Sequence, residues 1–188
     1  MKNFSDQEII DSVLKGNESD YSIIVDRYKN KAFSMLKRML KNDFDAEEIL
    51  QDCFLKAYHS LKSFKGEAKF STWFYKIVYN TALTKLSSKK RKIESEMSSV
   101  EDHFNLESDY NSMDVERKDL EEFLQEAIAK LPERYSSIIT LFYLNQLSVE
   151  EISEVMHLSV SNVKVMLHRS RNALRDFILN SRLAEEFI

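Results

Sequence analysis

The sequence Phe70-Ser-Thr-Trp73-Phe-Tyr-Lys-Ile-Val-Tyr79-Asn80 is the stretch around which this protein is organised. Half of the residues from Phe70 to Tyr79 are aromatic, whereas the whole chain is 11% aromatic. A single helix face cannot bury all of these rings, so we expect some of them to be exposed. Basic residues lie among the rings, and exposed rings with basic neighbours are suited to stacking unpaired bases beside a phosphate backbone. The alternative is an ordinary amphipathic helix with Trp73 in its core.

The composition predicts an all-α protein. The chain has 188 residues, with two glycines and one proline, and β architectures with many turns need more of both. This length allows one or two small domains. The single cysteine, Cys53, excludes a disulfide framework and a cysteine-based zinc site, and we interpret it as a buried apolar residue.

The sequence indicates a cytoplasmic protein that does not insert into membranes. Its first residues lack an apolar signal region, and the longest apolar run, residues 138–144, is too short to span a bilayer. The chain shows no glycine-rich nucleotide-binding loop, activated nucleophile or catalytic dyad. We therefore expect a protein that is not an enzyme and uses no cofactor or metal.

The net charge of −4 hides a marked asymmetry along the chain. Residues 93–116 carry eight acidic side chains and no Lys or Arg, while residues 1–92 hold 18 basic and 12 acidic side chains. The acidic stretch also lacks helical periodicity, so we interpret it as a flexible linker. The sequence thus predicts two small helical domains, 1–92 and 117–188, joined by an acidic linker over 93–116.

Helical periodicity and capping residues predict four helices in the first domain. Ser5-Asp-Gln-Glu8 forms a capping box that begins a short helix, and Asp20, Asp43 and Ser71 are the expected caps of the next three. The third helix carries an acidic face on an otherwise basic domain, and we expect this face to dock on a partner. Its residues are Asp45, Glu47, Glu48, Gln51 and Asp52.

The second domain contains the pattern of a helix-turn-helix. Ser148-Val-Glu-Glu151 begins a short helix, a turn follows at residues 157–159, and Ser159 caps a longer helix. Basic and amide side chains on the outer face of that helix are suited to base edges and phosphates of duplex DNA. The alternative is a plain helical hairpin. The candidate DNA-contacting residues are Ser159, Ser161, Asn162, Lys164, His168, Arg169 and Arg171, and we expect Arg171 to contact phosphate.

These motifs, in this order and spacing, closely resemble those of ECF-type RNA polymerase sigma factors, within the sigma-70 superfamily. Residues 45–58 resemble the core-polymerase-binding helix, and Phe64-Lys-Gly66 with residues 70–80 resembles the promoter-melting segment. Leu131-Pro-Glu-Arg-Tyr135 and residues 151–171 resemble the C-terminal helix-turn-helix. The resemblance covers most of residues 5–180.

The resemblance implies a sigma factor that binds core RNA polymerase, captures the unpaired non-template strand of the minus-ten element, and reads the minus-thirty-five duplex. It leaves open whether an anti-sigma protein is a further partner. The minus-ten candidates are Phe64, Lys65, Lys69, Phe70, Ser71, Trp73, Tyr75, Lys76 and Asn80. Trp73 is expected to pack inward and shape the loop, whereas Phe70, Tyr75 and Asn80 are expected to contact bases.

The chain departs from the family pattern at the turn and on the recognition helix. His157 stands where the family usually has glycine, and Asn162 stands in place of a usual threonine. Val165 and Met166 replace more polar residues, and Ser153 and Ser170 replace small alanines. These differences bear on promoter preference.

Two other functions are compatible with parts of the sequence. A helix-turn-helix regulator that binds duplex DNA without core polymerase explains residues 148–172, but neither the aromatic cluster nor the acidic face. A helical metalloprotein is suggested by Glu154-x-x-His157, but di-iron bundles need two such motifs and two further helical glutamates.

Overall fold

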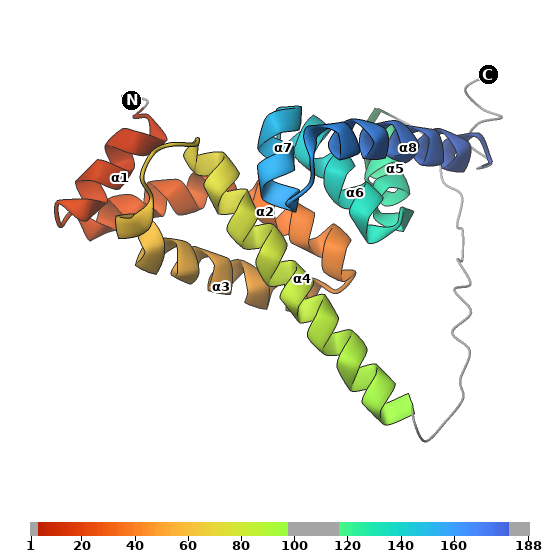
Figure 1. Ribbon diagram of the computed structural model, residues 1–188, viewed down its shortest axis with the longest axis horizontal. Coiled ribbons are helices and arrows are strands. Elements are labelled where there is room, and N and C mark those ends of the chain that lie inside the picture. The colour runs from red at the N-terminus through yellow and green to blue at the C-terminus, as the bar shows by residue number, and fades with distance from the viewer. Residues whose placement is uncertain (1–3, 98–116, 181–188) are drawn as a thin grey trace.

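The computed structural model describes residues 4–97 and 117–180, with side chains for 4–90 and 122–180. These residues are helical, without strands, as Figure 1 shows. The front unit consists of α1 (Asp6–Leu14), η1 (Glu18–Asp20), α2 (Tyr21–Leu40), α3 (Asp43–Ser60), η2 (Leu61–Ser63) and α4 (Phe70–Met97). The rear unit consists of α5 (Arg117–Lys130), α6 (Glu133–Ile139), η3 (Thr140–Leu144), α7 (Val149–Met156) and α8 (Val160–Leu179).

Local capping explains where several helices begin. Both predicted capping boxes are present, at Ser5 with Glu8 and at Ser148 with Glu151. The prediction for α3 is wrong by one residue, because the side chain of Asn42 accepts the N–H of Asp45 and Asp43 is already helical. Asp20 precedes α2 without capping it through its side chain, which instead accepts a hydrogen bond from Ser12.

The helix α4 starts earlier and ends later than the sequence predicts. It begins at Phe70, so Ser71 lies inside the first turn, and it continues to Met97. Residues 93–97, predicted to be linker, are therefore helical. The last turns carry charged residues in place of an apolar stripe. Because periodicity analysis detects a helix by its apolar stripe, the sequence did not reveal these turns. The rest of the predicted linker, residues 98–116, lies outside the described residues.

The two units share one hydrophobic core, although the sequence suggests two separate ones. Helix α4 packs against α3 and α2 on one side and against α7 on another, while α2 also contacts α6. Figure 1 shows α4 crossing the molecule diagonally between these neighbours. The core cluster accordingly joins Phe74 and Val78 of α4 to Ile152 and Val155 of α7.

A single turn of π-helix joins α6 to the helix-turn-helix. The N–H of Asn145 donates to the carbonyl oxygen of Thr140 at 2.9 Å, which closes the wider turn, and the chain then enters α7 at Val149. Leu141 within this turn and Leu147 after it are buried. The turn thus anchors the helix-turn-helix in the common core.

Candidate polymerase and nucleic-acid interfaces

The acidic face of α3 is only partly free. Lys85 of α4 approaches Glu48 to 2.6 Å and Asp45 to 3.2 Å, and Glu48 and Asp45 together raise the pKa of Lys85. Lys89 lies 3.6 Å from Asp45 as well. Two of the five predicted residues therefore bind α4. The other three are exposed: Glu47, Gln51 and Asp52.

Two apolar residues on the same helix were missed from the sequence. Phe44 is 78% exposed and Leu55 is 57% exposed, at opposite ends of the acidic face. With Glu48 and Asp52 they follow helical spacing, so all four share one side of α3. Exposed apolar residues beside charges on one side of a helix can supply contact area to a protein partner. The helical spacing of Phe44, Asp52 and Leu55 in the sequence could have shown that the two apolar residues lie on the acidic face.

The loop before α4 is shaped by Gly66 and an aromatic cluster. Gly66 has a φ of +71°, a left-handed conformation that favours glycine. Phe64 lies 5.2 Å from Trp73 and 5.7 Å from Phe70, measured between ring centroids. Lys65 and Lys69 are exposed in this loop. Trp73 is half-buried and supports the loop, in agreement with its expected position.

The expectation that rings of the cluster lie exposed is wrong for this structure. Phe70, Phe74, Tyr75 and Tyr79 are all buried, at 4% exposure or less. One side of α4 packs on the front unit, where Phe74 stacks on Phe54 at 4.8 Å and Phe70 meets Tyr28 at 5.5 Å. The other side packs on the rear unit. A helix covered from two sides can bury rings all around its circumference.

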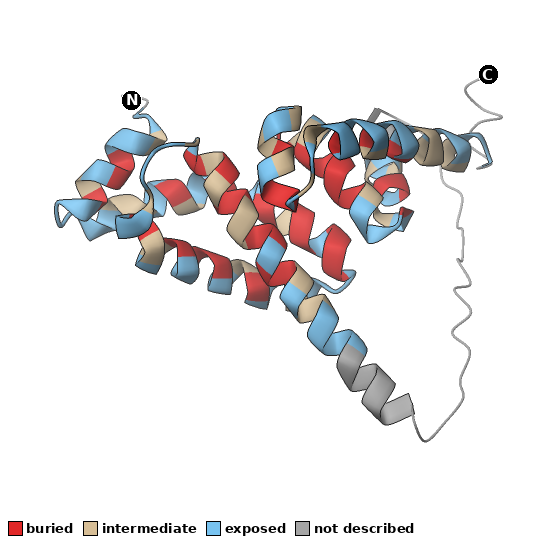
Figure 2. Ribbon diagram, in the orientation of Figure 1, coloured by how far each residue is buried: buried red, intermediate tan, exposed pale blue. Residues whose placement is uncertain are grey.

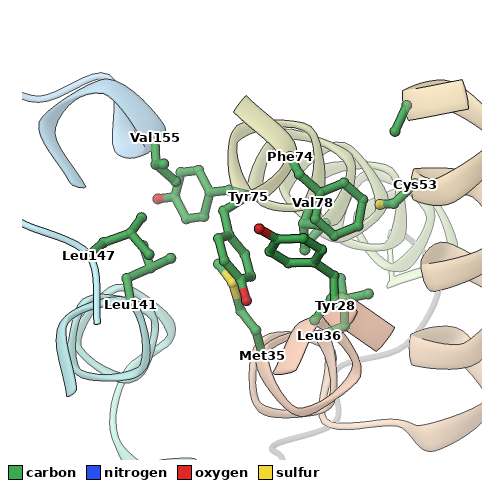
Figure 3. Packing of buried hydrophobic residues seen from close by; sticks show 14 of the residues in the cluster. Tyr28, Met35, Leu36, Cys53, Phe74, Tyr75, Val78, Leu141, Leu147 and Val155 are labelled. Atoms are coloured by element: carbon green, nitrogen blue, oxygen red, sulfur yellow. The ribbon is translucent and has the colours of Figure 1, made fainter. Parts of the chain in front are cut away.

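The two ring residues that we expected to contact bases, Phe70 and Tyr75, lie in different surroundings. Phe70 is surrounded by Tyr28, Phe64, Trp73 and Phe74, so it belongs to the core of the front unit. Tyr75 instead lies between the two units: Figure 3 shows it between residues of α2 and residues of the rear unit. Burial raises the pKa of Tyr75 well above that of an ordinary tyrosine.

Several predicted minus-ten residues lie along the contact with α7. The Nζ of Lys69 is 3.0 Å from Oε1 of Glu151, and the Nδ2 of Asn80 is 3.3 Å from Nε2 of His157. Ser71 and Lys76 on the same helix are half-buried. Burial raises the pKa of Glu151, but the N–H of Ser148 and the charge of Lys69 outweigh it, so the pKa lies below the ordinary value.

The helix-turn-helix forms as predicted, with the turn at residues 157–159. His157 has a φ of 54°, so it adopts the left-handed conformation that glycine would take with less strain. The hydroxyl of Ser153 donates to the carbonyl oxygen of Leu158 at 2.6 Å and braces the turn. The side chain of Ser159 accepts the N–H of Asn162 and caps α8. Leu158 and Val163 anchor the turn in the core.

The outer face of α8 is open to solvent. Figure 2 shows exposed residues along this helix, and the predicted DNA-contacting side chains are all exposed: Ser159, Ser161, Asn162, Lys164, His168, Arg169 and Arg171. Asn172 lies 3.2 Å from His168 and orients its ring. Arg171 stacks on Phe142 and Tyr143, at 5.5 and 5.6 Å, which the sequence did not reveal.

The described residues contain neither a metal site nor a membrane span. Among residues 4–97 and 117–180, no group of three or more His, Cys, Asp or Glu is placed to hold a metal ion. Within the same residues, no helix is both long and apolar enough to cross a bilayer.

These features define a helical DNA-binding protein in which a helix-turn-helix packs on a basic helical unit. Residues 24–92 match the family model "Sigma-70 region 2", and residues 123–174 match "Sigma-70, region 4". The chain is 36% identical over 174 residues to the ECF RNA polymerase sigma factor SigW of Bacillus subtilis, covering 88% of this chain and 92% of that protein. It is 33% identical over 181 residues to the ECF RNA polymerase sigma-E factor of Haemophilus influenzae, covering 93% and 95%.

Two solved structures have a similar fold. CnrH, solved with the cytosolic domain of CnrY, has a TM-score of 0.65 at 19% identity, covering 94% of this chain and 99% of that one. The sigma factor RpoE of Bartonella quintana, solved with the anti-sigma factor NepR, has a TM-score of 0.67 at 17% identity, covering 87% and 99%. The chain belongs to the ECF RNA polymerase sigma factors, and it acts in promoter recognition at the start of transcription.

Proposed function

We propose that this sigma factor docks on core RNA polymerase through the outer side of α3. The support is the exposed polar group of Glu47, Gln51 and Asp52, of which Glu47 and Asp52 are acidic, with the exposed apolar residues Phe44 and Leu55 beside it. Apolar anchors supply contact area, while the charges set the orientation of docking. Lys85 and Lys89 hold α3 rigidly on α4, so that docking fixes the position of the melting segment.

We also propose that α8 reads duplex DNA. The supporting observation is that its outer face is exposed, while the turn at residues 157–159 and the cap at Ser159 fix where the helix begins. Its amide and imidazole groups, Asn162 and His168, suit base edges, and Lys164 and Arg169 suit base edges or phosphates. This face would read the minus-thirty-five duplex. Arg171 approaches the backbone while it stacks on Phe142 and Tyr143, so it both contacts DNA and stabilises the rear unit.

Residues 64–80 are proposed to open the minus-ten element by trapping unpaired bases. Each base stacked on an aromatic ring contributes roughly 1–3 kcal/mol. Opening a duplex step costs about 1.4 kcal/mol on average, so a few trapped bases offset a few opened pairs. Lys65, Lys69 and Lys76 add attraction for the backbone. Because Phe70 lies in the core of the front unit, Tyr75 and Asn80 are the base-contacting candidates, and Phe70, Trp73 and Ser71 position them.

The test is promoter opening by holoenzyme reconstituted from core polymerase and this chain. A promoter selected from a random library would be offered as intact duplex and with a pre-melted bubble. Lys69→Ala and Asn80→Ala should open the duplex poorly and regain part of their activity on the bubble. Lys62→Ala, an exposed lysine of η2 outside the segment, is the matched control. Normal opening by both variants would place the melting function elsewhere, and absence of core binding would favour a regulator that acts without polymerase.

A further inference from the structure

We infer that Val165 is a specificity-determining residue of α8, and that it recognises the C5-methyl group of thymine in the major groove. The inference rests on the proposed reading of duplex DNA by α8, and it names the base that one position of this helix selects. Val165 was not among the DNA-contacting residues that we predicted, because all of those are polar or charged.

Val165 lies at the centre of the outer face of α8. A helix turns about 100° per residue, so Val165 points about 160° away from both Val163 and Leu167. Those two residues are buried in the common core, whereas Val165 is 49% exposed. The burial of Val163 and Leu167 therefore fixes the direction of Val165, whose side chain points away from the core.

Predicted DNA-contacting side chains surround Val165 on this face. Ser161 and Arg169 lie one turn before it and one turn after it, while Asn162 and His168 lie on either side of the line that joins them. All four of these residues are exposed. A duplex that contacts them must also meet the side chain of Val165.

The position of Val165 on the helix favours contact with bases over contact with phosphates. A recognition helix lies in the major groove with its N-terminal residues at the base edges, and Val165 lies in the second turn of α8. Lys164 and Arg171 lie about 100° and 120° round the helix from Val165, on the same margin of the face. Their charges suit the phosphates that border the groove, which leaves the centre of the face to the bases.

A valine side chain can discriminate among bases only through apolar contact. Of the four DNA bases, thymine alone presents an apolar group in the major groove, whereas the other three present hydrogen-bond donors and acceptors there. An isopropyl group against those polar edges removes water and supplies no hydrogen bond, which costs free energy. Val165 therefore favours thymine and disfavours the other bases. Its branched Cβ has one preferred χ1 rotamer in a helix, which holds both methyl groups in place.

The surroundings of Val165 do not suit a protein partner. Within α8, all of which the structure describes, Val165 is the one large apolar residue that is exposed between Ser159 and Arg171. The core of a protein interface is apolar and depleted of charge, whereas here a single apolar side chain lies among hydrogen-bonding and charged groups. A base edge with one methyl group beside donors and acceptors matches this arrangement.

The test is a scan of thymine to uracil in duplex DNA bound by holoenzyme, which is reconstituted from core polymerase and this chain. Upstream duplex sites are first selected from a random library. Each thymine in the selected site is then replaced singly by uracil, which removes one methyl group and keeps the base pairing. In the wild type, one position should lose affinity roughly threefold to fivefold, as expected for one methyl group. The same replacement should leave the affinity of Val165→Ser unchanged.

Methylated cytosine gives the complementary measurement. Replacement of the sensitive thymine by cytosine, with guanine opposite, should weaken wild-type binding. Methylation of that cytosine at C5 should recover roughly threefold, because it restores the methyl group. Val165→Ser should not respond to the methylation. A wild type that does not respond would contradict the inference.

Leu179→Ser is the matched control variant. Leu179 is an exposed apolar residue at the end of α8, about 20 Å along the helix from Val165. This variant should keep the uracil-sensitive position of the wild type. Both substituted side chains are half exposed, so the urea midpoint of each variant should stay close to that of the wild type.

Failure of the inference and failure of the proposed function give different results. If changes of whole base pairs alter affinity but no uracil does, or if the uracil effect persists in Val165→Ser, α8 reads duplex DNA and the role of Val165 is wrong. If neither base-pair changes in the upstream duplex nor Lys164→Ala alters affinity, α8 does not bind that duplex. The proposed function of α8 then fails, and the role of Val165 fails with it.

Discussion

Lys69 and Glu151 form an ion pair between α4 and α7, with 3.0 Å between Nζ and Oε1. The same glutamate accepts the N–H of Ser148 at 2.7 Å, so one carboxylate both caps the first helix of the helix-turn-helix and binds the melting segment. This double use ties the local stability of α7 to its contact with the front unit.

Acid should therefore loosen α7. The pKa of Glu151 is lowered in the folded protein, so its contribution to stability is present above the ordinary glutamate pKa and is lost as the pH falls through the folded value. We expect hydrogen exchange in α7 to speed up on acidification in the wild type. Glu151→Gln should show a smaller pH dependence, with Glu154→Gln as control. Equal pH dependence in all three proteins would show that another group controls α7.

Removing the unpaired hydroxyl of Tyr75 should stabilise the protein. Tyr75→Phe leaves the ring in place and is expected to raise the free energy of unfolding by about 1 kcal/mol, because no hydrogen bond is lost. Tyr28→Phe is the matched control: its hydroxyl donates to Asp6, so the same change should lower stability by about 1 kcal/mol. Urea denaturation measures the free energy of unfolding of both variants. A loss of stability in Tyr75→Phe would contradict the prediction that this buried hydroxyl lacks a hydrogen-bond partner.

Charge reversal on the free part of the acidic face should weaken binding to core polymerase. The double variant Glu47→Lys, Asp52→Lys avoids Glu48, whose reversal would also break the contact with Lys85. We expect an affinity loss of at least about tenfold in a pull-down with core enzyme, with helicity unchanged. Asp11→Lys on α1 serves as the control for charge.

The apolar ends of that face allow an independent check. Leu55→Ala should leave the free energy of unfolding nearly unchanged, because the side chain is 57% exposed, yet it should weaken core binding. The buried neighbour Phe54 should behave in the opposite way: Phe54→Ala should cost about 3 kcal/mol of stability. If Leu55→Ala binds core enzyme as the wild type does, α3 docks through another side.

Two substitutions on α8 should separate sequence reading from phosphate binding. Arg171→Ala should lower duplex affinity about equally for all sequences and reduce the salt slope by about one. It should also destabilise the rear unit by about 0.5–1 kcal/mol through loss of the contacts with Phe142 and Tyr143. Asn162→Ala should instead change the ranking of duplex sites in a binding selection. Identical effects of both variants on every site would make the assignment of roles wrong.

Much of the rear unit was predictable because its signals are local. Ser148, Glu151 and Ser159 mark helix starts through hydrogen bonds that span three residues, and the structure confirms all of them. The left-handed turn at His157 follows from the tight spacing between the two helices. By contrast, the stacking of Arg171 on Phe142 and Tyr143 joins segments far apart in the chain, and periodicity along one helix does not report it.

The sequence by itself determined the helical class, the helix-turn-helix, the acidic side of α3 and the family, because capping, periodicity and motif spacing act over a few residues. Only the tertiary structure decided which side chains of those surfaces are free. Asp45 and Glu48 face outward in the sequence pattern but bind Lys85. Tyr75 is buried against the rear unit, and Asn80 stays exposed while its side chain approaches His157. The physical reason is that α4 packs on two units at once. Burial of a ring or pairing of a charge depends on which helix arrives from elsewhere in the chain, and that is a property of the assembled core.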